Sequence, residues 1–444
     1  MKLNLKFGAV FLVLAFFLQS CSSFLSKEQP QFVTVAGTKF KIGDRPYYFV
    51  GTNFWYGSYL GMEGAKGNRE RLIKELDHLK ELGVTNLRVL AISTVSPLNN
   101  SLKPALETTP GVFDKDLFDG LDFLLYEMKK RDMKGVLFLN NFWEWSGGMV
   151  TYNNWFGGGE LIDPSKPGGS WDDFMNYSAG FYRNEKAMAH FRTSVEKVIR
   201  RYNKYSNVNY FDDPTIMSWQ LANEPRPGNG ARGETVVDAY EKWINETAEY
   251  IHSLDKNHLV TTGSEGLAGS LQSESYYKRA HQSRFIDYMT FHLWVKNWSW
   301  FDATHPETSY PEAEAKAVDY IQKHIGYATE LGKPVVMEEF GMERDLGKFS
   351  TLTKTNYRDK YYRRVFELAY QNAASGGPLA GTNFWAWGGE ARATKDEAIW
   401  HEGDPFTGDP PQEPQGVNSV FNSDLSTIKI IQEYAEKMNS LDKK

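Results

Sequence analysis

The sequence predicts an α/β fold, a (β/α)8 or TIM barrel that forms a single domain and begins with an N-terminal β-hairpin. Short apolar runs alternate with amphipathic segments of helical length, a pattern typical of parallel strands joined by crossover helices. Eight such units favour a closed barrel over an open sheet, and 444 residues fit one barrel with long loops. No Gly-x-Gly-x-x-Gly motif follows the first predicted strand, which argues against a dinucleotide-binding fold.

The predicted strands are short runs rich in apolar residues. Residues 32–42 and 47–55 predict a hairpin that leads into the first barrel strand. The other barrel strands are predicted at residues 86–91, 135–140, 216–222, 259–263, 286–294, 334–340 and 382–387.

The predicted helices follow the strands in turn. In the first, Leu72, Ile73, Leu76 and Leu79 recur at helical spacing and define one apolar face. Helices are predicted at residues 69–82, 117–131, 186–202, 236–254, 313–331, 357–374 and 425–437, with a weaker one at 270–280. In such a barrel, functional groups lie at the C-terminal ends of the strands.

The N-terminal segment predicts export. Lys2 and Lys6 form a basic start, and the apolar run 7–18 is too short to span a bilayer. Leu18-Gln19-Ser20-Cys21 resembles a bacterial lipobox, in which the Cys carries lipid, although Gln19 is not the usual small residue. An ordinary secretory signal with an incidental Cys21 is the alternative. We expect residues 1–21 to be a signal peptide, 22–31 a linker and 32–444 the barrel domain.

Composition narrows the class of partner. The formal net charge of −6 argues against nucleic acid, because phosphate binding needs a basic surface. A single cysteine excludes an intrachain disulfide. The 13 Trp, 24 Tyr and 28 Phe residues indicate either a large aromatic core or a cleft lined with rings, which pack well on the apolar faces of sugars.

Carboxylates end two of the predicted strands. Asn223 and Glu224 follow the fourth strand, and Glu338 and Glu339 lie at the end of the seventh. One such carboxylate usually caps a strand or pairs with a cation, but two at one barrel face match the acid and nucleophile of glycoside hydrolysis. Asn223 is placed to bond a sugar 2-hydroxyl. Adjacent strand residues point to opposite faces, and periodicity does not choose between Glu338 and Glu339.

Other strand ends add cationic and aromatic side chains. Arg88 has apolar neighbours, so it needs an anionic partner, either a catalytic carboxylate or a structural ion pair. His292 is either a satisfied core residue or a site residue, and no second His or Cys at ligand spacing indicates a metal. Alternate tryptophans that line the cleft or fill the core end strands three and eight: Trp143 and Trp145, and Trp385 and Trp387.

This set of strand ends resembles glycoside hydrolase family 5, and within it the endo-β-1,4-mannanases, over nearly all of residues 32–440. Asn-Glu-Pro at 223–225 is similar to the acid/base strand of the family, and Glu-Phe-Gly at 339–341 to its nucleophile strand. The resemblance thus implies that Glu224 is the acid/base and Glu339 the nucleophile. The candidate substrate-binding residues are Arg88, Asn223, Arg226, His292, Trp294, Trp385 and Trp143.

Three features are similar to the mannanase branch in particular. Arg226 follows Asn-Glu-Pro, where the branch has a residue that binds mannose in a positive subsite. Residues 291–298 look like its sixth strand, with Trp294 where a Tyr often bonds the nucleophile. The long loop 388–421, and 408–416 within it, look like the loop after its eighth strand, and such length itself indicates a functional role.

The resemblance implies a retaining, endo-acting β-1,4-mannanase that cuts mannan, galactomannan or glucomannan by double displacement. It implies no cofactor and no metal, and we expect a monomer that touches a membrane only through lipid on Cys21. That anchor predicts the outer membrane or cell surface, with secretion or the periplasm as the alternative. A related β-1,4-glucanase and a silent glycan-binding lipoprotein are the rival functions. Rates on mannan and hydroxyethyl cellulose separate the first, and binding without release of reducing sugar identifies the second.

Overall fold

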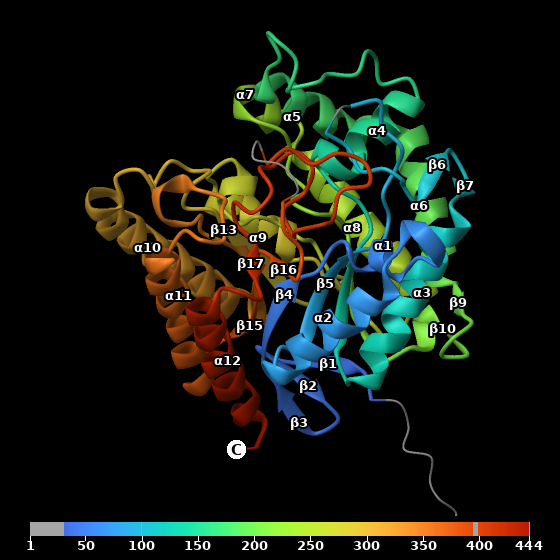
Figure 1. Ribbon diagram of the computed structural model, residues 1–444. Coiled ribbons are helices and arrows are strands. Elements are labelled where there is room, and N and C mark those ends of the chain that lie inside the picture. Colours follow the sequence, from blue (N-terminus) through green and yellow to red (C-terminus); the bar gives the residue numbers. More distant parts are fainter. Residues whose placement is uncertain (1–30, 99, 394–397, 444) are drawn as a thin grey trace, which may run out of the picture. The chain divides into compact units, whose positions relative to one another are not determined.

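A ring of parallel strands forms the centre of the computed structural model, which describes residues 31–98, 100–393 and 398–443 (Figure 1). Their side chains are buried on both faces, which explains why the strands read as continuous apolar runs. In chain order they are β4 (Phe49–Asn53), β5 (Asn86–Leu90), β8 (Lys134–Phe138), β11 (Ile216–Gln220), β12 (Leu259–Thr261), β13 (Met289–Leu293), β14 (Val335–Phe340) and β15 (Leu379–Phe384).

The ring follows the order of the chain and returns on itself. Each strand pairs with its neighbour in sequence except at β12 and β13, and β15 pairs with β4, so that Phe384 lies opposite Thr52. Between β12 and β13 the contact narrows to one bridge, Thr261 to Tyr288, with the Asp287 amide donating to the Val260 carbonyl at 2.8 Å. The predicted (β/α)8 barrel is confirmed.

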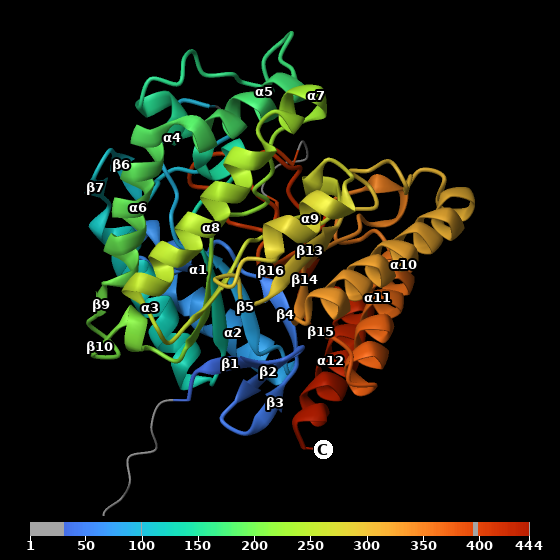
Figure 2. The same ribbon diagram turned by 180° about the vertical axis from the view of Figure 1, so that it is seen from behind.

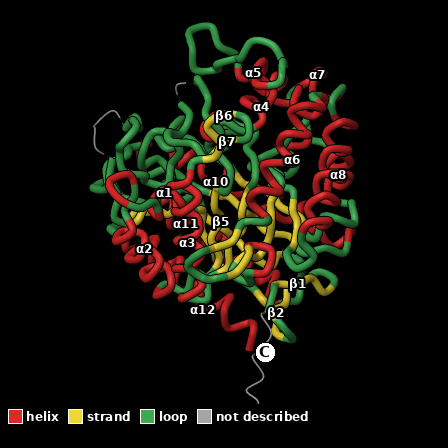
Figure 3. The backbone as a smooth tube through the Cα atoms, turned by 90° about the vertical axis from the view of Figure 1, so that its right-hand side faces the viewer, coloured by secondary structure: helices red, strands yellow, loops and turns green. Residues whose placement is uncertain are grey.

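Helices surround the strands, and Figure 3 shows them outside the ring. Polar caps help to fix where they begin: the Asn68 side chain accepts from the Arg71 amide, and Asp114 accepts from the amides of the first turn of the third helix. The helices that follow the strands are α2 (Arg69–Glu81), α3 (Lys115–Lys130), α6 (Glu185–Ile199), α8 (Val237–Leu254), α9 (Glu274–His281), α10 (Pro306–Leu331), α11 (Asn356–Ala374) and α12 (Leu425–Asn439).

The N-terminal hairpin differs from its prediction. Residues 33–47 form a separate three-stranded antiparallel sheet, with β1 (Val33–Ala36), β2 (Lys39–Ile42) and β3 (Arg45–Tyr47). Gly37 and Gly43, with φ of 61° and 60°, make the two tight turns, so the chain reverses twice before β4 begins. Figure 2 shows this sheet at the lower end of the barrel, away from α5 (Trp171–Ala179) and α7 (Gly230–Glu234).

The predicted eighth strand was placed too late along the chain. It runs from Leu379 to Phe384, so Trp385 follows the strand and Trp387 belongs to a separate short element. Gly381 pairs with Phe49 here, and its missing side chain allows the close approach of the Phe49 ring. A glycine-rich start made the first half of this strand unrecognisable by apolar content.

The loops after the strands carry further short elements and gather at the upper end of the barrel in Figure 1. Those that matter for the site are the turn η2 (Glu144–Ser146), α4 (Met149–Trp155) and α5. The others on these loops are α1 (Gly57–Gly61), η1 (Gly64–Lys66), β6 (Glu107–Thr109), β7 (Val112–Phe113), η3 (Gly180–Arg183), η5 (Ala268–Ser270), η6 (Asp345–Gly347), β16 (Trp387–Gly389) and β17 (Val420–Phe421). Four short elements follow helices instead: β9 (Tyr202–Asn203), β10 (Val208–Asn209) and η4 (Tyr210–Asp212) after α6, and η7 (Ser440–Lys443) after α12.

The predicted signal peptide, with Cys21, and nearly all of the predicted linker lie outside the described residues. Phe32–Lys444 form one compact unit. Across the part of the chain that the structure describes, no helix combines the length and the apolar character needed to cross a membrane.

Candidate active site

A cleft of about 520 Å³ opens where the strands end. Its walls come from the ends of strands β8, β11, β13 and β14 and from the loops after them and after β12 and β15. The cleft brings together most of the residues predicted from the sequence: Trp143, Asn223, Glu224, Arg226, Trp294, Glu339 and Trp385. Arg88 and His292 are fully buried and contact the carboxylates of this cleft.

Glu224 is held by an unusual backbone conformation. After β11 the Asn223 amide donates to the Asn140 carbonyl at 2.8 Å, and the Glu224 amide donates to the Gly263 carbonyl at 3.0 Å. Between these anchors Glu224 has a φ of 51°, in the left-handed region that residues with a side chain rarely adopt. Backbone strain of this kind persists only where neighbours enforce it, and it clusters at functional sites.

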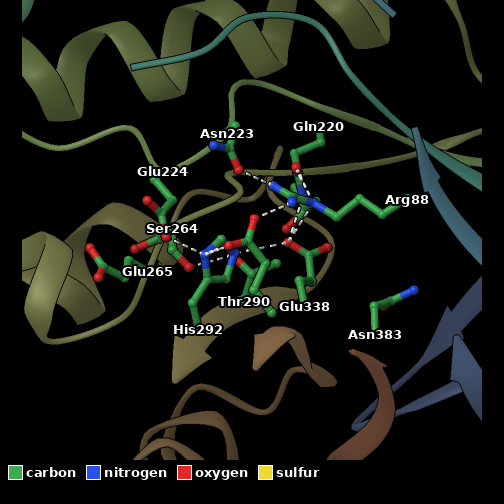
Figure 4. A network of polar contacts seen from close by, with 12 residues as sticks. Arg88, Gln220, Asn223, Glu224, Ser264, Glu265, Thr290, His292, Glu338 and Asn383 are labelled. Carbon is green, nitrogen blue, oxygen red and sulfur yellow. Dashed lines mark hydrogen bonds and ion pairs between the residues drawn. The ribbon is translucent and has the colours of Figure 1, made fainter. Parts of the chain in front are cut away.

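Glu339 faces the cleft from a strand whose alternation is interrupted. Strand β14 carries an extra residue opposite β13: Phe291 pairs with Met337, and His292 pairs with Glu339. This bulge breaks the strict alternation of side chains along β14, so both glutamates lie inside the barrel while one of them faces the cleft. Glu338 accepts from Gln220 Nε2 at 2.5 Å inside the barrel (Figure 4). Of the two glutamates, only Glu339 lines the cleft.

Arg88 organises the polar groups beneath the cleft, as Figure 4 shows. It donates from Nη1 to Glu339, from Nη2 to Asn223 Oδ1 at 2.7 Å and from Nε to Gln220 Oε1 at 2.8 Å. The Asn223 amide nitrogen in turn donates to Asn141 Oδ1 at 3.1 Å. A rigid guanidinium fork therefore sets the positions of Glu339 and Asn223 relative to each other.

His292 lies between the two catalytic candidates. Its Nδ1 is 2.7 Å from Glu224 Oε1 and 3.2 Å from Glu339 Oε2. Burial alone would lower the pKa of His292, but the charge of Glu339 and the contacts with Glu224 and Glu338 outweigh it and raise that pKa to about 10. His292 is therefore an imidazolium at neutral pH.

The pKa of Glu224 moves opposite to the expectation for a general acid. Burial would raise the pKa, but the hydrogen bond and charge of His292, with the charge of Arg226 and the Trp143 indole, lower it to about 2. The substrate-free site thus favours the ionised form of Glu224. The proton of the Glu224–His292 pair resides on His292.

Glu224, His292 and Glu339 lie close enough together to form a candidate cation site. One donor atom each from Glu224, His292 and Glu339 lie within 4.8 Å of one another. The Arg88 guanidinium already binds Glu339, and His292 Nδ1 already lies 2.7 Å from Glu224 Oε1. The described residues thus balance the two carboxylates with two protein cations, and the donor set fits a metal ion poorly.

The tryptophans divide between cleft and core. Trp143 donates its indole N–H to Glu224, and Trp145 and Trp385 also border the cleft. Trp387 is fully buried and donates to Glu75 Oε2 at 2.8 Å. Of the two tryptophans predicted at the eighth strand, Trp385 therefore borders the cleft and Trp387 belongs to the core. The Trp294 ring stands edge-on to Trp385, at 6.0 Å between centroids, and lines the cleft.

Sequence reasoning missed several cleft residues. Glu265 ends the loop after β12, where it pairs with Arg226 and accepts from Trp298 Nε1 at 3.1 Å. A carboxylate shortly after a barrel strand is the same signal that marks Glu224 and Glu339. Glu144 and Trp171 lie on the loops after β8, and Glu413 lies on the loop after β15. Strand ends do not point to positions so far along a loop.

The chain matches the model of a family described as "GH family 5 beta-mannosidase-like" over residues 30–443. The protein belongs to glycoside hydrolase family 5. The predictions of this family and of a glycoside hydrolase are confirmed.

Relatives within the family are similar over most of their length. The glycoside hydrolase family 5 mannosidase of Rhizomucor miehei is 34% identical, with a TM-score of 0.85, covering 93% of this chain and 99% of that one. The endo-β-1,4-mannanase of Thermotoga petrophila is 25% identical, with a TM-score of 0.63, covering 89% and 77%. Mannan endo-1,4-beta-mannosidase 4 of Solanum lycopersicum is 29% identical, covering 82% of this chain and 86% of its own.

Proposed function

We propose that this family 5 hydrolase cleaves β-1,4-linked mannan with retention of configuration. The observation that carries the proposal is the spacing of the carboxylates. Oxygens of Glu224 and Glu339 lie within 4.8 Å of each other, and retaining enzymes hold their carboxyl groups about 5–5.5 Å apart, whereas inverting ones need about 6.5–9.5 Å. The names of the relatives supply the substrate class.

In the first step, a Glu339 oxygen attacks the anomeric carbon, and the glycosidic carbon–oxygen bond breaks. Glu339 suits this role because its carboxylate is held by Arg88 and lies at the cleft surface. The leaving oxygen takes a proton from Glu224. In the second step water donates a proton to Glu224, attacks the same carbon and displaces Glu339, and the β configuration is restored.

His292 holds the proton that Glu224 has to deliver. In the free site Glu224 is ionised and its Oε1 lies 2.7 Å from Nδ1 of the imidazolium. A leaving oxygen that gains negative charge draws this proton through Glu224, so the two residues act as one acid. The Trp143 indole, which donates to Glu224 Oε2, fixes the direction of the carboxyl group.

The proposal is tested by the anomer released from mannan oligosaccharides, followed by proton NMR before mutarotation. We expect the β anomer of the new reducing end to appear first. Initial appearance of the α anomer overturns the retaining mechanism, and absence of turnover on mannan with turnover on β-glucan overturns the substrate class.

For the mode of attack we propose cleavage within the chain, in line with the names of the plant relatives. A second candidate, release of mannose from a chain end, is supported by the description of the matching family as beta-mannosidase-like and by the name of the Rhizomucor miehei mannosidase. Mannose as the sole early product from mannohexaose selects the second candidate, and a mixture of oligosaccharides selects the first.

We also propose that the mature chain is lipid-anchored at Cys21, at the outer membrane or cell surface. The lipobox-like Leu18–Cys21 segment supports this. Radiolabelled palmitate should be incorporated into the exported protein and not into Cys21→Ser. Equal labelling of both, or release of the unaltered protein into the medium, contradicts the proposal.

A further inference from the structure

The glutamates that line the cleft differ in how well they are bonded. Glu224 contacts His292 and Trp143, Glu339 accepts from Arg88, and Glu265 contacts Arg226 and Trp298: each has its partners in the protein. Glu144 does not. Neither of its carboxyl oxygens has a hydrogen-bond partner on another residue in the part of the chain described here.

Glu144 is not a surface side chain that water compensates. It is 2% exposed, yet it lines the catalytic cleft between two tryptophans. Both rings are fixed: Trp143 stacks on Phe174 with centroids 6.2 Å apart, and Trp145 packs against Trp55 at 5.3 Å. The Glu144 carbonyl accepts from Ser101 Oγ at 2.5 Å, which anchors the backbone. The carboxyl group is thus buried beside the cleft without a hydrogen bond from any other described residue.

Glu107 is a buried glutamate whose carboxyl group is fully hydrogen-bonded within the protein. It is also fully buried, but it accepts from Tyr152 at 2.7 Å, from Ser194 at 3.0 Å and from the Gly111 amide at 2.8 Å. Buried polar groups in proteins are normally bonded in this way. An unbonded carboxyl at the edge of a catalytic cleft departs from that rule and points to a partner outside the protein.

The chemistry of Glu144 suits a neutral sugar. Burial, with a smaller contribution from the charge of Asp163, raises the pKa of Glu144 to about 7. Near neutrality the group exists in part as a carboxylic acid, which both donates and accepts. Sugar hydroxyls do the same.

We propose that Glu144 is a substrate-binding residue whose carboxyl group bonds hydroxyl groups of a mannosyl unit held in the cleft. The proposal rests on the proposed function, because it takes the ligand of the cleft to be a β-mannoside. It adds a binding position on the loop after β8.

The test compares Glu144→Met, which keeps the length of the side chain and removes its hydrogen bonds, with Glu144→Gln, which restores some of them. In Glu144→Met, kcat/KM on mannopentaose should fall about 10- to 100-fold, the cost of bonds between a charged or acidic group and its partner. Glu144→Gln should recover part of the loss. The Tm should stay level or rise, because an unbonded buried carboxyl is removed.

Glu107→Gln is the matched control, since it removes a bonded buried carboxylate. It should lower the Tm and leave kcat/KM of the folded enzyme unchanged. Binding is measured separately by calorimetry with mannopentaose in a Glu339→Gln background, where Glu144→Met should weaken affinity by a similar factor.

Two failures are distinguishable. If the unaltered enzyme turns over no mannoside, the proposed function fails. If it is active, and Glu144→Met stays within twofold in kcat/KM or loses Tm as Glu107→Gln does without weaker binding, the role of Glu144 is overturned.

Discussion

The carboxyl groups on the floor of the cleft and those on its rim differ in their hydrogen bonding. On the floor, at the strand ends, Glu224 and Glu339 are bonded to His292, Trp143 and Arg88 before any substrate arrives. On the rim, Glu144 and Glu413 keep buried oxygens that have no hydrogen-bond partner among the described residues. The floor is preorganised for charge that develops during reaction, whereas the rim is completed by what binds there.

The largest effect should follow from removing the floor nucleophile. Glu339→Ala should lower kcat by roughly 10⁴- to 10⁶-fold, because no other group at the site can form the covalent intermediate. With an activated aryl β-mannoside, added azide should enter from the vacated face and give the α-mannosyl azide, read by NMR.

Glu224→Ala is the counterpart. It leaves the nucleophile, so azide should attack the covalent intermediate and give the β-mannosyl azide. An exchange of the two products between the variants reverses the assigned roles. Equal, small losses in both variants place catalysis elsewhere.

The next largest effect concerns the proton that His292 shares with Glu224. His292→Gln should lower kcat/KM by about 100-fold, the usual contribution of a positioned proton donor. In the unaltered enzyme, activity should fall as pH rises through the His292 pKa of about 10, because the Glu224–His292 pair then loses its proton. The variant should lose this alkaline limb, which a purely structural role of His292 would leave in place.

His292 also predicts how stability depends on pH. Its pKa is raised on folding, from about 6.5 to about 10, so its contribution to stability is complete below pH 6.5 and is lost as pH rises to 10. The Tm of His292→Gln should therefore converge with that of the unaltered enzyme over this window. A constant difference in Tm from pH 6 to 10 contradicts the charged state of His292.

The floor was largely predictable from sequence, because it depends on strand ends. The run before Asn223 and Glu224 is apolar enough to mark a strand, and an arginine among apolar neighbours demands a carboxylate. The bulge in β14 was not predictable, because it depends on how β13 and β14 pair across the ring. The sharing of one proton by Glu224 and His292 could not be predicted either. It depends on the close approach of two residues that are 68 positions apart in the sequence.

The rim was barely predictable, and its residues show why. Glu144 is separated from β8 by a loop, and nothing local distinguishes it from Glu107, although one is bonded and the other is not. Its length and the resemblance of residues 408–416 marked the loop that carries Glu413 as functional, but neither singled out Glu413. The path of this loop is set by Asp409, which accepts from the amides of Gly416 at 2.8 Å and Asn418 at 3.0 Å, and such loop-internal bonds have no period along the chain.

The smallest effect is expected at Glu413. This residue lies on the loop after β15, whereas Glu144 lies on the loop after β8. Burial, with the charges of Asp409 and Glu339, raises the pKa of Glu413 to about 8. Ionised Glu413 is thus penalised in the folded state, and stability falls as pH rises from about 4.5 to 8. Glu413→Gln removes this penalty, so its advantage in Tm should grow across that window and then stay level.

In activity, Glu413→Gln should cost less than about tenfold in kcat/KM, because the amide keeps a donor and an acceptor at the cleft wall. The loss should be larger for Glu413→Met, as for Glu144. If Glu413→Gln shows no pH-dependent gain in Tm, the carboxyl is already ionised and paired, and the rim then resembles the floor. The contrast between bonded floor and unbonded rim would in that case rest on Glu144 alone, and the loop after β15 would serve the shape of the cleft rather than its hydrogen bonds to sugar.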